Sequence, residues 1–275
     1  MALVDRYPVL LLDLDGTIVR GDEPIPGAAE AIAGVREHGS RIAFVTNNAT
    51  RAPDDVARHL ARAGVQADPA EVVTSAIATA ETLAARAVRS ACVIGETALR
   101  ASLQAAGIEV RDASSDGSAV DVVVVGLDRD TTYADLRVAA EQVQRGATLV
   151  ATNSDTSYPV PGGVAPGAGA LLAVIEATTG SRAEVIGKPH PALLEAAVAA
   201  TGGGGPVLVV GDRLDTDVAG AVGLGWDSLL VLTGVSTQEE VRASPVIPTY
   251  VAQTLGALLS DPEPDRVVRP DRRPA

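Results

Sequence analysis

The sequence is poor in cysteine, aromatic residues and lysine, and each shortage narrows what the chain can be. A single cysteine, Cys92, in 275 residues excludes an internal disulfide and fits a reducing compartment. Aromatic residues make up only 2% of the chain, so a core must be built from Ala, Val and Leu. Every basic residue except Lys188 is an arginine. A site that needs one compact positive charge would not accept the wide planar fork of arginine, so Lys188 is a candidate functional residue.

Positive charge and long apolar runs are also scarce. The net charge of −13 argues against nucleic acid or an anionic membrane as a partner, because both bind a basic face. No run approaches the roughly 20 apolar residues that span a bilayer. The early apolar run Val9–Leu12 is short and is followed at once by Asp13, which is unlike a secretory signal. We therefore expect a soluble, cytoplasmic protein.

Strand patterns alternate with helical patterns along most of the chain. Strands are predicted at residues 9–14, 41–46, 72–75, 92–95, 122–126, 148–152, 184–186, 207–210 and 228–232. Helices are predicted at residues 26–38, 53–63, 76–86, 96–106, 133–145, 167–179, 191–201 and 216–222, and a turn-rich loop at 153–166. Strands separated by helices imply parallel βαβ units with right-handed crossovers.

The number of predicted strands is too large for one small sheet, so the sequence predicts two α/β domains. Segments with chemically active side chains lie near both ends of the chain, which favours a central insertion into an outer domain. The expected core domain combines residues 1–78 and 184–260, and the inserted domain covers 79–183. The tail at 261–275 has four prolines and many charges, and it is predicted to be disordered.

Polar side chains lie at the carboxyl ends of the predicted strands. Asp13 and Asp15 lie at the end of the first strand, Thr46 and Asn47 at the end of the second, and Lys188 shortly after the strand at 184–186. Taken alone, the two aspartates also fit a strand that ends in an ordinary Asp-Gly turn. If the strands are parallel neighbours, however, their carboxyl ends converge on one crevice, where open α/β sheets bind ligands.

The strand at 207–210 adds more carboxylates to the same predicted edge, at Asp212, Asp215 and Asp217. Clustered carboxylates repel one another unless a hard cation neutralises them, and Mg²⁺ is held by carboxylates, waters and phosphate oxygens. A carboxylate can attack phosphorus, and a second one can move the proton. This set of polar side chains therefore predicts Mg²⁺-dependent phosphoryl transfer.

These segments resemble, in order, the four signature motifs of the haloacid dehalogenase (HAD) superfamily. The motifs are DLDGT at 13–17, TNN at 46–48, Lys188 in GKP, and GDRLDTD at 211–217. Together with LTG at 232–234 they are similar to the capped subfamily IIA, which contains nitrophenyl, pyridoxal phosphate and glycerol phosphate phosphatases. The resemblance implies a Rossmann-like parallel-sheet core with an α/β cap inserted between the second and third motifs.

The resemblance also implies a role for each motif residue. Asp13 would be the nucleophile and a Mg²⁺ ligand, and Asp15 the general acid and base, with its backbone carbonyl on the metal. The hydroxyl of Thr46 and the amide of Asn47 would bind the phosphate.

In the two later motifs, Lys188 would neutralise charge between the nucleophile and the phosphate. Asp212 would ligate Mg²⁺, and Asp217 would support it without direct contact; Asp215 competes for that last role. An aspartate at position 15 favours phosphate ester hydrolysis over cleavage of a carbon–halogen bond.

Substrate specificity is expected to come from the cap. Asn153, Asp155 and Tyr158 lie in the predicted loop and are candidates to contact the part of the substrate away from the phosphate. Among small phosphorylated metabolites, the resemblance favours glycerol 3-phosphate or a related polyol or sugar phosphate. Capped relatives also suggest a homodimer.

Two alternative functions share this inventory. One is a phosphomutase or phosphotransferase on the same scaffold, which passes the phosphoryl group to another alcohol. The other is a non-enzymatic phospho-acceptor domain, which also uses aspartates, a Thr and a Lys with Mg²⁺. Asp15 and a cap of about 100 residues count against the second alternative.

Overall fold

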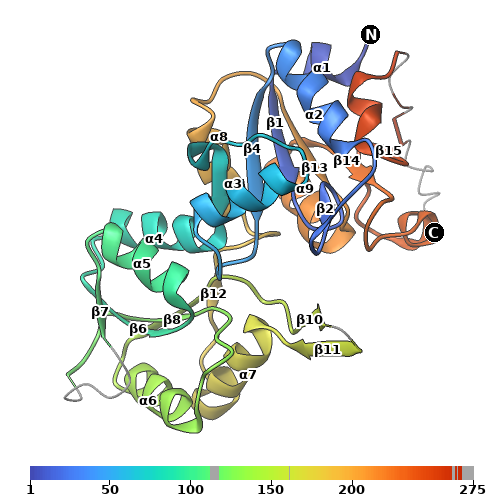
Figure 1. Cartoon of the computed structure of the whole chain (residues 1–275). Helices are drawn as coiled ribbons and strands as arrows, with labels where there is room; N and C mark the ends of the chain where they lie inside the picture. Colours follow the sequence, from blue (N-terminus) through green and yellow to red (C-terminus); the bar gives the residue numbers. More distant parts are fainter. Residues whose placement is uncertain (112–117, 161, 262–263, 265, 268–275) are drawn as a thin grey trace. The chain divides into compact units, whose positions relative to one another are not determined.

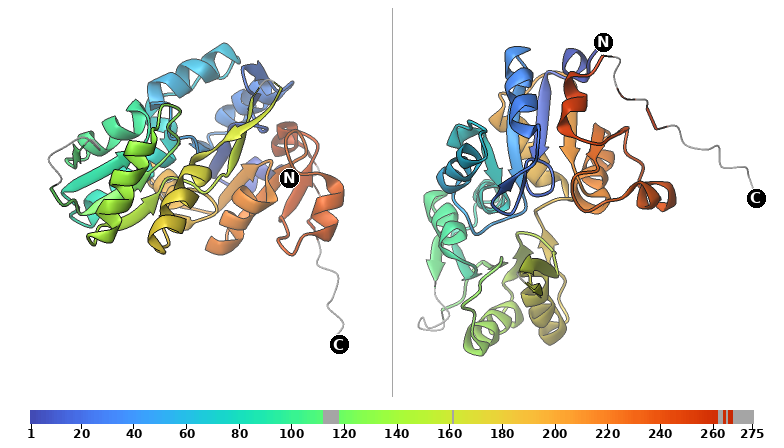
Figure 2. Two further views of the ribbon diagram at one scale, coloured as in Figure 1. Left: turned by 90° about the horizontal axis from the view of Figure 1, so that it is seen from below. Right: turned by 45° about the vertical axis from the view of Figure 1, so that its right-hand side comes forward.

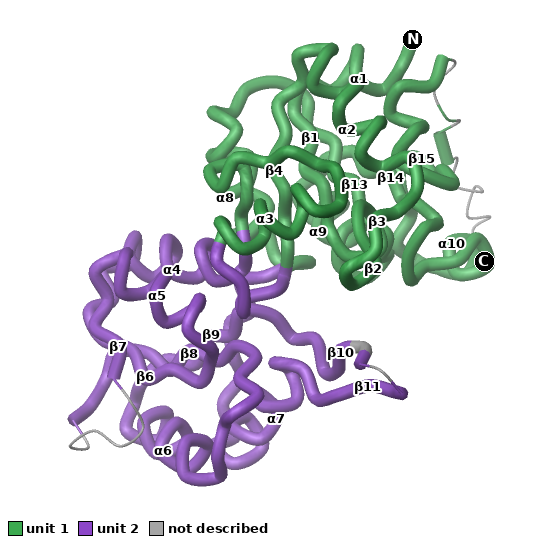
Figure 3. The backbone as a smooth tube through the Cα atoms, viewed as in Figure 1, with its two compact units in different colours: residues 1–46, 53–73, 188–275 green, residues 47–52, 74–187 purple. Residues whose placement is uncertain are grey.

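The chain folds into two compact units. The structure is a computed structural model that describes residues 1–111, 118–160, 162–261, 264 and 266–267. Unit 1 comprises residues 1–46, 53–73 and 188–275, and unit 2 comprises residues 47–52 and 74–187 (Figure 3). Of the helices in the described ranges, none is both long and apolar enough to cross a membrane.

The limits of the inserted unit differ from those expected at residues 79 and 183. Helix α4 (Ser75–Ala85) begins directly after β5 (Val72–Thr74), so residues 74–78 fall in unit 2. Strand β12 (Glu184–Val185) pairs in parallel with β9 (Thr148–Ala151), which keeps residues 184–187 in unit 2 as well. Each boundary is set by an element that contacts another element of unit 2: α4 packs against the helix at Thr97–Ala105, and β12 pairs with β9.

Unit 1 is built on a mainly parallel sheet. In the described residues this sheet has six strands in the order β15–β14–β13–β1–β4–β5 (Figure 1). Besides β5, its strands are β1 (Val9–Asp13), β4 (Arg41–Thr46), β13 (Val207–Gly211), β14 (Asp227–Val231) and, at the other edge, β15 (Tyr250–Ala252). The pairs β1–β4, β1–β13, β13–β14 and β14–β15 are all parallel. The predicted parallel α/β core is therefore confirmed.

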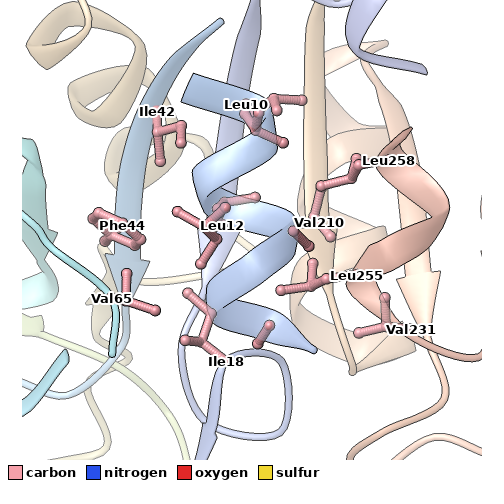
Figure 4. Close-up of a cluster of buried hydrophobic side chains, with 14 of the residues drawn as sticks. Leu10, Leu12, Ile18, Ile42, Phe44, Val65, Val210, Val231, Leu255 and Leu258 are labelled. Carbon is pink, nitrogen blue, oxygen red and sulfur yellow. The ribbon is translucent and has the colours of Figure 1, made fainter. Parts of the chain in front are cut away.

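Helices cover both faces of this sheet. Alternate strand residues point to opposite faces, and Leu10 and Leu12 of β1 pack into one apolar cluster with Phe44 (Figure 4). That cluster includes side chains of α1 (Leu3–Arg6), α2 (Ala28–Glu37), α3 (Pro53–Arg62) and the 3₁₀ helix Leu255–Leu259. Helix α8 (Pro191–Ala200) contacts β1 and β4, and α9 (Ala219–Leu224) contacts β14. Strands buried on both sides explain the unbroken apolar runs.

A polar cluster holds the amino-terminal edge of the sheet, opposite to the carboxyl ends of the strands. The Tyr7 hydroxyl donates to Asp227 at 2.6 Å and lies 3.2 Å from the Tyr250 hydroxyl. Asp227 also accepts from Thr249 at 2.9 Å and from Arg266 at 3.2 Å. Arg266 belongs to the tail that was expected to be disordered; the rest of that expectation, for residues 262–263, 265 and 268–275, lies outside the described residues.

Unit 2 contains a second α/β sheet. Counted over the described part of the chain, it has five strands in the order β12–β9–β8–β6–β7, with parallel pairing throughout. Its further strands are β6 (Ser90–Ile94), β7 (Glu109–Arg111) and β8 (Val122–Val125). The helices are α4, α5 (Thr97–Ala105), α6 (Tyr133–Gln144) and α7 (Ala168–Thr179), with α4 against α5 and α6 against α7.

The predicted loop at 153–166 is in fact largely a hairpin. Strands β10 (Ser157–Val160) and β11 (Gly163–Pro166) pair antiparallel and form a separate two-stranded sheet, visible in both views of Figure 2. The prolines and glycines of this segment disfavour a strand in the middle of a sheet, but a two-stranded hairpin tolerates them. Elements of unit 1 that the sequence did not predict include α1, the short hairpin β2 (Val19–Arg20) and β3 (Glu23–Pro24), α10 (Gln238–Ala243), β15 and the 3₁₀ helices Pro69–Glu71 and Leu255–Leu259.

Replacing Tyr7 with Phe should lower the free energy of unfolding by about 1–3 kcal/mol, because the change removes the hydroxyl that donates to the Asp227 carboxylate but keeps the ring. Denaturation by urea measures the change. The matched control is Tyr133→Phe, whose residue is 83% exposed, and it should shift the same free energy by less than about 0.5 kcal/mol. An equal free energy of unfolding for Tyr7→Phe and the wild type would contradict the proposed contribution of this cluster to stability.

Candidate active site

The carboxyl ends of three neighbouring strands bring the polar residues of unit 1 to one edge of its sheet. Asp13 is the last residue of β1, and it pairs in register with Val45 of β4, one residue before Thr46. On the other side, Leu12 pairs with Val210 of β13, two residues before Asp212. The parallel register therefore places Asp13 between the ends of β4 and β13.

Lys188 connects these strand ends through two short ion pairs. Its Nζ atom lies 2.6 Å from Oδ1 of Asp13 and 2.7 Å from Oδ1 of Asp217. The Lys188 side chain is 3% exposed, and that of Asp217 is 2% exposed. A buried ammonium is stable only when it is paired, so these three side chains form one electrostatic unit.

Asp212 is held at the base of the site by the loop that follows β14. Its Oδ2 atom accepts from the backbone N–H of Val235 at 2.6 Å, and its carbonyl accepts from the N–H of Ser236 at 3.0 Å. A Cβ atom on Gly234 would lie 1.9 Å from Oδ2, so only glycine allows this close approach. Among the described residues, Oδ1 of Asp212 is buried without a hydrogen-bond partner.

Asp217 lies on a π-helix (Leu214–Val218) that precedes α9. The sequence predicted an ordinary helix from Thr216, whereas the wider turn includes an i→i+5 bond from Val218 N–H to the Arg213 carbonyl. Both carboxylate oxygens of Asp217 are engaged, Oδ1 by Lys188 and Oδ2 by the N–H of Arg213 at 3.1 Å. Asp215 instead pairs with the Arg213 side chain at 2.8 Å. The geometry therefore favours Asp217 over Asp215 as the supporting carboxylate.

Asp15 is exposed, in contrast to Asp13 two residues earlier. The chain turns sharply here, because the carbonyl of Leu14 accepts from the N–H groups of Thr17, Ile18 and Val19. The Thr17 hydroxyl lies 3.5 Å from Oδ2 of Asp13. The turn thus separates the two aspartates into a partly buried carboxylate and a solvent-exposed one.

Burial raises the pKa of the Asp13 carboxyl well above its ordinary value; the Lys188 charge opposes this shift, and the nearby carboxylates of Asp217 and Asp212 add to it. Burial also raises the pKa of Asp212 to about 6, against the effect of the Val235 N–H. Burial by itself would lower the pKa of Lys188, but Asp13 and Asp217 outweigh it and raise that pKa. The site therefore carries negative charge that is costly to bury.

The donor set fits a hard divalent cation. Within the described ranges, Asp13, Asp212 and Asp217 each offer a carboxylate oxygen, and these oxygens lie within 4.8 Å of one another. Three carboxylates and one ammonium leave two formal negative charges when all are ionised, which a divalent ion would balance. The unpartnered Oδ1 of Asp212 supplies an oxygen ligand of the kind that Mg²⁺ prefers. With both Asp217 oxygens engaged, Asp13 and Asp212 are the side chains best able to bind it.

The remaining candidates from the sequence have different surroundings. Thr46 is buried, and Asn47 directly follows it but belongs to unit 2. Asn153 is also buried; its Nδ2 donates to the Asn47 carbonyl and its Oδ1 accepts from the N–H of Asp155. Tyr158 lies on β10, paired with Ala165 of β11.

The loop after β14 contributes contacts that the sequence analysis did not assign. The Thr233 hydroxyl donates to the carbonyl of Gly16 at 2.6 Å, and the Thr233 carbonyl accepts from Arg20 at 2.6 Å. The same loop therefore holds both Asp212 and the turn after Asp13. The LTG segment at 232–234 was its only signal in the sequence, through the family resemblance.

Two family profiles match the chain. "Haloacid dehalogenase-like hydrolase" matches residues 10–109, and "HAD-hydrolase-like" matches residues 185–258. An acid sugar phosphatase of Staphylococcus haemolyticus is 37% identical over 260 residues, which cover 94% of this chain and 97% of the relative.

Solved structures agree with these matches. The glycerol phosphate phosphatase of Mycobacterium tuberculosis in complex with magnesium has a TM-score of 0.87 and 41% identity, over 94% of this chain and 78% of that one. A thermostable NPPase double mutant from Geobacillus stearothermophilus has a TM-score of 0.84 and 36% identity, over 93% of this chain and 98% of that one. The chain therefore belongs to the haloacid dehalogenase-like hydrolases.

Proposed function

We propose that this hydrolase is a Mg²⁺-dependent phosphatase that cleaves small phosphomonoesters through an aspartyl-phosphate intermediate. The observation that carries the proposal is the cluster of Asp13, Lys188 and Asp217 beside Asp212, whose Oδ1 is buried and has no partner among the described residues. The site thus offers a nucleophilic carboxylate, a fixed ammonium and an oxygen ligand for a cation. The phosphatase relatives support the same reaction class.

In the first step, a carboxylate oxygen of Asp13 attacks phosphorus and the bond to the ester oxygen breaks. Asp15, which is exposed, gives its proton to the departing alkoxide as a general acid. In the second step, Asp15 takes a proton from water, and the water oxygen attacks phosphorus. The Asp13–phosphorus bond breaks, inorganic phosphate leaves, and both side chains return to their initial states.

The other residues hold the phosphate and the cation. Lys188 stabilises negative charge on the non-bridging oxygens while it fixes the Asp13 carboxylate, and Thr46 with the Asn47 amide donates hydrogen bonds to the phosphate. Asp13, Asp212 and the Asp15 carbonyl would hold Mg²⁺, with Asp217 in support. The bound cation supplies charge neutralisation and polarises the phosphate oxygens.

The substrate class that we propose is a polyol or sugar phosphate, with glycerol 3-phosphate as the first candidate. The M. tuberculosis relative is a glycerol phosphate phosphatase and the staphylococcal relative an acid sugar phosphatase, which together favour small hydroxylated esters. Asp155 and Tyr158 of unit 2 are the proposed specificity residues. We further propose that the protein acts in the cytoplasm as a homodimer, a state that light scattering after size-exclusion chromatography measures.

A panel of aryl, glycerol and sugar phosphates tests the proposed function. We expect Mg²⁺-dependent release of inorganic phosphate, and transfer to added glycerol would instead indicate a phosphotransferase. Asp13→Asn should abolish turnover, because the amide is a poor nucleophile, while the melting temperature shows whether the variant remains folded. Full activity of Asp13→Asn, or a stable phospho-aspartate without turnover in the wild type, would overturn the mechanism.

Replacing Lys188 with Arg should lower kcat/KM by at least about a hundredfold, because the planar guanidinium cannot occupy the position of the ammonium between Asp13 and Asp217. Steady-state kinetics with an aryl phosphate measures this loss. Arg58→Lys is a matched control that also keeps the charge; its side chain is 64% exposed, so wild-type activity is expected. An active Lys188→Arg enzyme would argue against the need for a compact cation.

Gly234→Ala should raise the Mg²⁺ concentration for half-maximal activity about tenfold or more. The new Cβ would lie 1.9 Å from Oδ2 of Asp212, so the proposed ligand must move. Gly223→Ala is the control, because a Cβ there meets no heavy atom within 4 Å and Gly223 lies on α9. That control should keep its Mg²⁺ dependence and unfold no more easily than the wild type. Identical Mg²⁺ titrations for the two variants would contradict the assignment of Asp212.

A further inference from the structure

Two side chains from distant parts of unit 2 donate to one backbone carbonyl, that of Asn47. Ser75 Oγ lies 2.6 Å from this oxygen, and Asn153 Nδ2 lies 2.9 Å from it. Ser75 is completely buried and Asn153 is 6% exposed. Asn47 itself is half-buried, and its carbonyl has two partners that come from side chains rather than from a neighbouring strand.

The Asn153 side chain is itself held in one orientation. Its Oδ1 accepts from the N–H of Asp155 at 3.1 Å, so its Nδ2 must face the Asn47 carbonyl. Nδ2 also lies 3.4 Å from the Thr152 hydroxyl. Both polar atoms of Asn153 thus have partners inside unit 2. The substrate contact expected for Asn153 from the sequence stays a prediction.

A third segment packs against the Asn47 side chain. A Cβ atom on Gly187 would lie 2.6 Å from Oδ1 of Asn47 and 2.4 Å from the Thr152 carbonyl, so a larger residue would displace one of them. Asn47, Ser75 and Gly187 each lie within two residues of a point where the chain passes between units 1 and 2 (Figure 3). One hydrogen-bonded cluster therefore ties three of these crossing points together on the unit 2 side.

We propose that Ser75 and Asn153 are positioning residues for phosphate binding, which they serve by fixing the peptide between Asn47 and Asn48, directly after the Asn47 N–H. A peptide group is planar, so two bonds to the Asn47 carbonyl also fix the direction of the Asn48 N–H. They restrain the segment that directly follows Thr46. The inference rests on the proposed function, because the Asn47 amide is one of the proposed phosphate donors.

The effect of removing one donor should depend on whether the other is present, because both bond the same carbonyl. When one is removed, the carbonyl keeps its second partner; when both are removed, it loses both side-chain bonds. Their effects on phosphate affinity should therefore be non-additive, as expected for residues that share one partner. Two independent structural residues would instead give additive effects.

The test uses Asn153→Asp, Ser75→Ala and the double variant in the full-length protein. Asn153→Asp keeps Oδ1 for Asp155 but replaces the donor with an acceptor, and Ser75→Ala removes one oxygen. We expect the double variant to bind inorganic phosphate about tenfold to a hundredfold more weakly in the presence of Mg²⁺, as measured by calorimetry, and each single variant to lose less. We also expect faster hydrogen exchange at residues 48–52 and a matching fall in kcat/KM with an aryl phosphate.

Thr79→Val is the matched control. Thr79 is a buried residue of the same helix whose hydroxyl donates to the Ser75 carbonyl at 2.7 Å, so the control removes a buried hydroxyl without changing a donor to Asn47. If Asn153→Asp does not fold, Asn153→Ala, which also removes the donor, replaces it in the single and the double variant. Phosphate affinity and exchange equal to those of Thr79→Val would overturn the proposal. A wild type that binds phosphate but cleaves no ester would overturn the proposed function only.

Discussion

The ion pairs of Lys188 with Asp13 and Asp217 are the interaction on which the rest of unit 1 depends. These residues come from three distant segments, and each is costly to bury alone. If any one of the three segments were missing, a charged side chain of the other two would lose an ion-pair partner. The ion pairs therefore require one particular register of β1 against its neighbours. A shift of one residue would turn the side chain of Asp13 to the other face of the sheet.

Much of the core fold could be predicted because its strands are buried on both faces. An apolar run with a polar residue at its end marks both the strand and its carboxyl edge, as in Val9–Asp13 and Val207–Gly211. The outer parts give weaker patterns. Strand β15 has only three described residues, and the prolines and glycines of the β10–β11 hairpin are equally typical of a loop. Short elements at an edge depend on their neighbours more than on their own sequence.

The candidate site was predictable in its charged groups but not in their support. Position at a strand end pointed to Asp13, Lys188 and Asp212, whereas the π-helix that aims Asp217 at Lys188 has no sequence pattern of its own. The bond from Asn153 to the Asn47 carbonyl joins residues far apart in the chain. Such a contact follows from tertiary packing, and nothing in the local sequence distinguishes it from ordinary turn chemistry.

The pairing of β1 with β13 has a consequence for the order of events during synthesis. Val9 can pair with Val207 only after the whole of unit 2 has been synthesised. Until then, the edge of β1 that pairs with β13 has no partner strand. Most of unit 2, residues 74–187, is continuous in the chain and can form contacts first. The ion pairs of Lys188 with Asp13 and Asp217 therefore cannot all form until the ribosome has passed Asp217.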